Sequence, residues 1–261
     1  YASANYTLPA TSTLYISSAG NVGIGTTSPS GQLHMVKEGV AQNIIFENNR
    51  DASTGAAFLD FYKSRGTNAS KTIAQDGDFT FNLRGLGWDG VNYTQAGAIK
   101  MQVDGTPGAA DMPGRIGFFT TPDGSNSPLE RLTIKNDGKV GIGTTGPSTK
   151  LELYGTSAVG SQLKIRREET TAIGGSGILL FHNNASGALP SSGDRLGYFL
   201  FSSLDGSTDR NGGGIVGYAD EAWSSTSIPT RFAFEVAPSG STTRSAALTI
   251  KSNGNVGIGT T

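Results

Sequence analysis

Apolar residues alternate with small or polar residues along most of this chain, with a period of two. A period of two places apolar side chains on one face of a β-strand. We therefore predict strands at the groups that show it, which are Leu14/Ile16, Val22/Ile24, Leu33/Met35, Phe79/Phe81/Leu83, Ile99/Met101/Val103, Leu132/Ile134, Val140/Ile142, Leu151/Leu153, Leu163/Ile165, Phe232/Phe234/Val236 and Leu248/Ile250.

Short turn signals separate these strands. Asp76-Gly77, Asp104-Gly105 and Asn253-Gly254 are examples of the dipeptides that supply positive φ in tight turns. The one stretch with helix-friendly composition, 163–169, still has alternating apolar residues, so we predict a strand there too. Strand and turn at short intervals predict an all-β fold.

One eight-residue phrase occurs three times. It reads Gly-Asn-Val-Gly-Ile-Gly-Thr-Thr at 20–27 and at 254–261, and has Lys for Asn at 138–145. The copies begin 118 and 116 residues apart, and a long regular period indicates a repeated structural unit. Residues 112–145 also align on 228–261 without a gap, and 57–61 roughly match 177–181. The centres, about 73–96 and 203–227, show no match.

The repeat divides the chain into two copies of one domain, preceded by a fragment of a third. We call each glycine-rich phrase with its flanking residues a collar. The expected parts are an N-terminal segment with the first collar (1–30), a β domain (31–131), a second collar (132–150), a second β domain (151–247) and a third, truncated collar (248–261).

Composition favours association between chains. Charged residues make up 16% of the chain, against about 25% in ordinary globular domains, and 38 residues are glycine. Such a chain gains little stability alone, because each glycine loses extra backbone entropy on folding. The net charge of −1 shows no bias towards nucleic acid, no apolar stretch is long enough for membrane insertion, and the chain has no cysteine for disulfides or thiolate metal sites.

The collars allow two interpretations. Val and Ile at alternate positions point the same way, and the glycines between them allow a close backbone approach or a sharp bend. Three chains could pack there around an axis, or each phrase could be a bulged hairpin within one chain. We favour the inter-chain interpretation because the phrase recurs at domain boundaries. The predicted packing residues are Val22, Gly23, Ile24, Gly25, Val140, Gly141, Ile142, Gly143, Val256, Gly257, Ile258 and Gly259.

Residues 132–155 resemble the linker repeats of bacteriophage tail-fibre and tailspike proteins, and residues 16–35 resemble the same element. Such repeats often precede a self-cleaving intramolecular chaperone domain, which this sequence does not contain, and they also occur in fibre-like bacterial surface proteins. The resemblance implies a homotrimeric fibre of stacked β domains joined by interwoven collars, on the outside of a virion. Its implied partners are copies of itself, other fibre or baseplate proteins, and a host-surface glycan.

The residues that usually carry chemistry are sparse. The glycine phrase lacks the Lys of a phosphate-binding loop and precedes no helix. His34 and His182 are far apart in sequence. The carboxylate pairs that a glycosidase would need are Asp76/Asp78, Asp205/Asp209 and Asp220/Glu221, and we interpret them as turn or surface residues. We therefore expect no catalytic, metal or cofactor site. The alternatives are a bacterial surface adhesin or extracellular filament subunit, and a glycan-degrading tailspike.

Aromatic residues in the unmatched centres are the candidate carbohydrate-binding residues. They are Trp88, Tyr93, Tyr218 and Trp223. A tryptophan beside Asp, Asn and Gly on a loop can stack on a sugar ring, and loops on a rigid scaffold often carry binding function. The other interpretation, which we favour slightly, is that each tryptophan fills the core of its own domain.

Overall fold

The computed structural model describes residues 14–39, 42–47, 57–156, 162–166, 176–182, 187–206 and 208–260. These residues form strands, turns and irregular segments and no helix, which confirms the predicted all-β fold. The chain divides into two compact units, residues 1–162 and 163–261. The predicted N-terminal segment up to residue 13, and Thr261 of the third collar, lie outside the described residues.

The first collar of unit 1 is a three-stranded sheet. Its order is β1-β2-β3, in which β1 pairs antiparallel with β2 and β2 pairs parallel with β3. The strands are β1 (Leu14–Ile16), β2 (Val22–Ile24) and β3 (Leu33–Met35). The glycine phrase supplies β2, so the collar includes residues well past its phrase.

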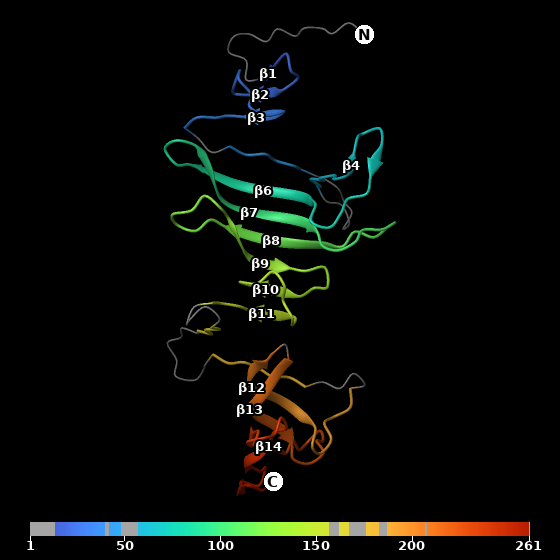
Figure 1. The fold of residues 1–261 in the computed structure, drawn as a ribbon, viewed down its shortest axis with the longest axis vertical. Coiled ribbons are helices and arrows are strands. Elements are labelled where there is room, and N and C mark those ends of the chain that lie inside the picture. The colour runs from blue at the N-terminus through green and yellow to red at the C-terminus, as the bar shows by residue number, and fades with distance from the viewer. Residues whose placement is uncertain are drawn as a thin grey trace. The chain divides into compact units, whose positions relative to one another are not determined.

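The main sheet of unit 1 has six strands in the order β11-β10-β9-β8-β7-β6 (Figure 1). Neighbours are antiparallel except for β10 and β11, which are parallel. A small hairpin of β4 and β5 precedes this sheet. The strands are β4 (Arg65–Gly66), β5 (Lys71–Thr72), β6 (Phe79–Trp88), β7 (Tyr93–Val103), β8 (Gly114–Thr120), β9 (Leu129–Ile134), β10 (Val140–Ile142) and β11 (Leu151–Leu153).

Unit 2 has one five-stranded antiparallel sheet in the order β12-β13-β14-β15-β16. Its strand order and pairing match those of β6–β10 in unit 1. The strands are β12 (Arg195–Asp205), β13 (Thr208–Ala219), β14 (Thr230–Val236), β15 (Ser245–Ile250) and β16 (Val256–Ile258).

The structural repeat includes the central regions of the two units, whose sequences do not match. At the start of β6 the Gly77 N–H donates to the Val103 carbonyl oxygen at 3.0 Å. At the start of β12, 116 residues later, the Gly193 N–H donates to the Ala219 carbonyl oxygen at 2.8 Å. The centres therefore form the same hairpin, and backbone pairing maintains it although the side chains differ.

The second and third collars are part of the main sheets, so the expected domain boundaries differ from the observed ones. The phrase of the second collar supplies β10, which continues the sheet formed by β6–β9. Residues 151–153, expected to begin the second β domain, instead pair with β10 as β11. The division between the units falls at 162/163, after this edge strand.

The strand predicted at Leu163/Ile165 is absent. Residues 162–166 are described without regular secondary structure, and Leu163 is 65% exposed. A strand needs a neighbouring strand to accept and donate its backbone hydrogen bonds. None of the sheets among the described residues includes residues 162–166.

A carboxylate ties each of these sheets to the turn that leads into its collar strand. In unit 1 Asp104 accepts hydrogen bonds from Lys135 Nζ at 2.5 Å and from the Asn136 N–H at 3.1 Å. In unit 2 Asp220 accepts from the N–H and Oγ of Ser252 at 3.1 and 2.8 Å. Asp104 and Asp220 are 116 residues apart, so this clamp belongs to the repeat.

Replacing Asp104 with Ala should lower the free energy of unfolding by about 1–2 kcal/mol, because Lys135 and the Asn136 N–H lose a charged acceptor. Burial raises the pKa of the Asp104 carboxyl, but these hydrogen bonds outweigh burial and lower it. The stabilisation is therefore complete above the unfolded pKa of about 3.9 and is lost as the pH falls through the lower folded pKa.

Urea denaturation at pH 7 and at several pH values below about 4, at one chain concentration, measures this loss. The matched control is Asp123→Ala, because Asp123 lies exposed in a turn. Equal midpoints for the two variants at pH 7 would contradict the clamp.

Candidate interaction surfaces

The collar glycines are required by contacts within one chain. A Cβ on Gly141 would lie 2.3 Å from the Thr144 carbonyl oxygen, and a Cβ on Gly143 would lie 2.1 Å from the Tyr154 carbonyl oxygen. Gly143 also has a φ of +80°, a conformation that other residues rarely adopt. After β10 the chain turns back sharply to place β11 alongside it, so backbone passes directly over these glycines.

The first collar repeats this arrangement, with 2.3 Å from Gly23 to the Thr26 oxygen and 2.0 Å from Gly25 to the Val36 oxygen. In the third collar Gly257 meets the Thr260 oxygen at 2.7 Å, while Gly259 has a φ of +68° and no close neighbour. Contacts within one chain are therefore sufficient to explain these glycines, and the packing of the collars between chains stays a prediction. The structure accounts for them by a tight bend within one chain.

The Val and Ile side chains of the collars remain available for contacts between chains. Val22, Ile24 and Val140 are half-buried. The later residues are more open, because Ile142 is 41%, Val256 61% and Ile258 82% exposed.

A hydrogen-bond acceptor braces the turn between the second and third strands of the first two collars. In the second collar Glu152 accepts from the N–H and Oγ of Ser148 at 2.7 and 2.8 Å, and these bonds lower the pKa of its carboxyl. In the first collar Nδ1 of His34 takes the same place and accepts from the Ser30 N–H at 3.3 Å. His34 therefore has a structural partner within the collar.

The main sheet of each unit has one face of apolar side chains. In unit 1 the paired positions across β6–β10 are Leu83, Ile99, Phe118, Leu132 and Ile142, beside a second row of Phe81, Met101, Ile116, Ile134 and Val140. In unit 2 the row equivalent to the first is Phe199, Ile215, Phe234, Leu248 and Ile258. We call these surfaces the apolar faces of units 1 and 2.

The chain does not cover its own apolar faces. Leu83 is 58%, Phe199 51% and Phe232 53% exposed, and Phe118 and Phe234 are both 40% exposed. Among the described residues only five hydrophobic side chains are fully buried, and three of them are alanines: Ala74, Val103, Val216, Ala219 and Ala233. Much of the surface that a folded protein normally buries is still open.

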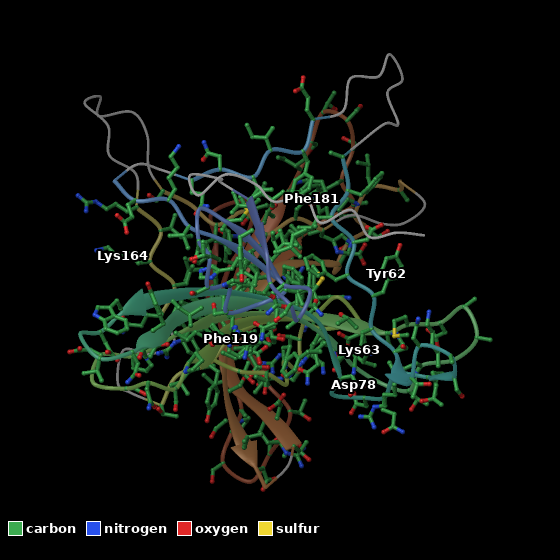
Figure 2. The ribbon with its side chains drawn as sticks, turned by 90° about the horizontal axis from the view of Figure 1, so that it is seen from above. Tyr62, Lys63, Asp78, Phe119, Lys164 and Phe181 are labelled. Carbon is green, nitrogen blue, oxygen red and sulfur yellow. The ribbon has the colours of Figure 1, made fainter. Side chains whose placement is uncertain are left out.

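The opposite face of each sheet is closed by polar side chains of its own unit. In unit 1 Arg115 donates to Gln102 Oε1 at 2.8 Å, and Lys100 Nζ lies 4.2 Å from the ring centre of Phe119 (labelled in Figure 2). In unit 2 Glu235 is 8% exposed and accepts from the Tyr218 hydroxyl. Burial, followed by this hydrogen bond, raises the pKa of Tyr218. These polar side chains therefore have partners within the chain, whereas the buried hydroxyls of Thr133 and Thr249 have no hydrogen-bond partner among the described residues.

Trp88 and Tyr93 lie opposite each other at the tip of the β6–β7 hairpin. Their ring centres are 5.3 Å apart in an edge-to-face arrangement, and the residues are 61% and 70% exposed. The pairing of β7 with β8 ends at Gly97, and the last bonds from that side join Thr121 to Ala96 and Gln95, so the tip beyond them extends past the rest of the sheet. The core interpretation of Trp88 is therefore wrong for the single chain.

Asp89 holds this tip in one conformation. Its carboxylate accepts hydrogen bonds from the Asn92 N–H at 2.7 Å, from Thr94 Oγ1 at 2.7 Å and from the Val91 N–H at 2.8 Å. These bonds, the Asn92 bond first, lower the pKa of Asp89 to about 2. The aromatic pair is thus both exposed and rigidly supported.

Trp223 and Tyr218 do not form one site with each other. Trp223 is half-buried, and its indole N–H donates to the Pro229 carbonyl oxygen at 3.1 Å. It lines a hollow of about 320 Å³ with Gly197 and Phe232 of the apolar face. Tyr218 is engaged with Glu235 on the other face. Trp223 belongs to the connection between β13 and β14, so it is not the structural equivalent of Trp88.

Four of the six candidate carboxylates have structural partners, namely Asp76, Asp78, Asp205 and Asp220. Asp76 accepts from the Gly105 N–H at 2.8 Å, and Asp78 binds Nε and Nη2 of Arg65 at 2.8 and 2.7 Å, which lowers the pKa of Asp78. Asp205 forms an exposed ion pair with Arg210. The described part of the chain contains no cluster of three metal-binding side chains. It also contains no helix that is long and apolar enough to cross a membrane.

Sequence reasoning missed the Asp104 and Asp220 clamps, although their spacing equals the repeat. It also treated the matching segments 57–61 and 177–181 only as repeat markers. Phe58, Tyr62 and Leu179 of these regions are 73%, 92% and 86% exposed. Their apolar character in both units was a signal that sequence reasoning did not use.

Gly143→Ala should lower the free energy of unfolding by more than about 2 kcal/mol, because the new Cβ meets the Tyr154 oxygen and the positive φ is strained. Amide exchange at Val140 and Tyr154, whose N–H groups bond to Lys150 and Ile142, should accelerate even in dilute single chains. The control is Gly146→Ala, where a Cβ meets open space. If the loss occurs only in assembled protein, the intrachain explanation fails.

Known protein-family models do not match this chain, and neither do the sequences of curated proteins. Its fold does match solved structures. One is the carboxy-terminal domain of the bacteriophage T5 L-shaped tail fibre, with a TM-score of 0.66 and 16% identity over 83% of this chain and 90% of that one. The other is the same domain with its intramolecular chaperone domain, with a TM-score of 0.67 and 17% identity over 83% of this chain and 62% of that one. The chain therefore has the fold of a bacteriophage tail-fibre domain.

Proposed function

We propose that this chain is a segment of a bacteriophage tail fibre that assembles as a homotrimer and supports or performs attachment to a host surface. The observation that carries the proposal is the exposed apolar face of each unit. Both faces recur at equivalent positions, and both belong to a fold shared with a phage T5 tail-fibre domain.

Association of identical chains is the simplest way to cover these faces. Burying apolar surface contributes about 25 cal/mol per Å², so leaving whole sheet faces in water forfeits most of the usual driving force for folding. The number three comes from the resemblance of the collars to tail-fibre linker repeats. The apolar rows run from β6 to β10 and from β12 to β16, so collar strands and sheets would contribute to one continuous interface.

The proposed role is mechanical and adhesive. The strands of each main sheet bond to one another from the first hairpin to the collar, and an aspartate clamp ties the collar turn back to that hairpin. A load on a collar strand is then shared by its whole sheet. Three identical chains would also present three copies of any binding loop, which multiplies weak contacts through effective concentration.

The tip of the β6–β7 hairpin is the proposed contact with a host-surface glycan. Trp88 and Tyr93 offer exposed ring faces on a loop that Asp89 holds rigid. Rigid aromatic side chains lose little conformational entropy on binding, which favours them as contacts. Tyr218 and Trp223 have less support, because the first is engaged with Glu235 and the second is half-buried.

A non-enzymatic role is part of the proposal. Its support is that Asp76, Asp78 and Asp220 serve as turn braces or ion-pair partners, while a glycosidase needs two carboxyl groups facing a common substrate. Prolonged incubation of the protein with bacterial capsule and lipopolysaccharide tests this part. The appearance of new reducing ends would contradict it.

The molar mass in solution tests assembly. Light scattering after size-exclusion chromatography should give three times the 27.0 kDa of the chain, because three copies can cover one another's apolar faces. A stable monomer of 27.0 kDa would contradict the homotrimer.

Trp88→Ala should weaken glycan binding at least about ten-fold, because aromatic anchors carry much of the energy of a small interface. The probe is an array of purified bacterial surface polysaccharides. The control is Leu204→Ala, at the equivalent hairpin position of unit 2 and 67% exposed. Binding should persist from about pH 7 to about pH 3, because Asp89 stays ionised until about pH 2. Unchanged binding by the Trp88 variant would rule out the tip as the contact.

A further inference from the structure

Two apolar segments lie beside the main sheets without joining them. Residues 57–62 come before the β6–β7 hairpin of unit 1, and residues 176–181 come before the β12–β13 hairpin of unit 2. Neither segment forms a backbone hydrogen bond to any described residue, and neither has regular secondary structure. Buried backbone groups need hydrogen-bond partners, and the described residues of the main sheets supply none to these segments.

One side of each segment rests on the sheet of its own unit. The Phe61 ring packs edge-on against Phe81 of β6, with ring centres 4.8 Å apart. Leu180 covers Gly197 of β12, where a Cβ on the glycine would lie 2.7 Å from Leu180 Cβ. Phe81 and Gly197 are equivalent positions on the two apolar faces. Phe61 and Leu180 therefore occupy the same place, one residue away from the match suggested by the sequences.

The other side of each segment points away from its own unit. Leu180 and Phe61 are 42% and 53% exposed, whereas Leu179, Phe181 and Tyr62 are 86%, 79% and 92% exposed (Figure 2 labels Tyr62 and Phe181). This alternation is typical of a strand that is covered on both sides in its complete structure. The outward side of the unit 2 segment is wholly apolar.

We propose that the outward side of each segment packs against the apolar face of a neighbouring copy of the same chain. The proposal rests on the proposed homotrimer and names the contact between its subunits. In unit 2 the contact is formed by Leu179 and Phe181 of one copy and by the face around Phe232 and Phe234 of the next. In unit 1 the equivalent contact uses Tyr62.

A second copy is the occupant that the structure favours. Both units keep the segment and the open face at equivalent places, although their hairpin sequences have diverged. Each unit therefore carries both halves of a head-to-tail contact, and such a contact closes into a ring when the rotation between copies allows.

The matched substitutions are Phe181→Asp in the segment and Val91→Asp at the hairpin tip, where the native side chains are 79% and 74% exposed. In a single chain both substitutions place an aspartate at an exposed position, so they should have similar effects on the folded chain. In the proposed assembly only Phe181 is buried, and an unpaired charge in an apolar contact is strongly disfavoured. The chain concentration needed for half-assembly, measured by light scattering, should rise at least about ten-fold for Phe181→Asp and stay unchanged for Val91→Asp.

Two further measurements keep the test independent of misfolding. The chain has no cysteine, so Leu179→Cys and Val91→Cys each introduce one thiol, and maleimide should label the first far more slowly in assembled protein. Amides of 176–182 in the unsubstituted protein should be protected from hydrogen exchange.

Three results together would overturn the segment contact and leave the homotrimer standing. They are a trimer in which the Leu179→Cys variant labels as fast as the Val91→Cys variant, free amide exchange over 176–182, and normal assembly of Phe181→Asp. A monomeric unsubstituted protein would overturn both proposals. If assembly requires a different added protein, that protein and not a second copy of the chain packs against the segment, and the proposal is overturned.

Discussion

The apolar faces that a single chain cannot cover are the constraint on which the rest of this structure depends. Each main sheet closes one side with its own polar side chains, such as Arg115 in unit 1 and Glu235 in unit 2. The other side shows rows of Leu, Ile and Phe to solvent. Since apolar burial is the main driving force for folding, we propose that association between chains completes sheets of this kind. A fibre is one assembly in which every copy both offers and receives such a face.

The collars show that the repeated glycine phrase can be explained by backbone geometry within one chain. The glycines of the repeated phrase permit the chain to turn back across Gly141 and Gly143, which places a parallel strand beside β10. A parallel neighbour normally needs a long crossover connection, so this short return leaves no room for side chains. The clamp from Asp104 to the Asn136 N–H then ties the collar to the preceding hairpin. The repeated phrase therefore reflects backbone geometry within each chain, and its Val and Ile side chains remain for contacts outside it.

The divergent hairpins lie on a common framework, and their differences leave the fold unchanged. The turns before β6 and β12 make the same backbone bonds, yet the tip of the first hairpin presents Trp88 and Tyr93 while the equivalent position in unit 2 is Leu204. Loops on a rigid scaffold tolerate such change because few contacts depend on them. The proposed adhesive role needs that division between an invariant assembly surface and a variable tip.

The sequence by itself determined the all-β class, the tandem repeat and ten of the sixteen strands, because alternation and turn chemistry are local properties that each segment carries alone. It did not determine which strands share a sheet, so the place of β11 and the lack of a strand at Leu163 emerged only from the pairing. It also could not tell whether Gly143 met another chain or Tyr154 of its own, since a close approach looks the same in sequence either way. Some features depend on residues that are distant in sequence. They are the exposure of Trp88, the hydrogen-bond partners of Asp104, and the inward and outward sides of the segment at Leu179. Only the tertiary structure brings those residues together.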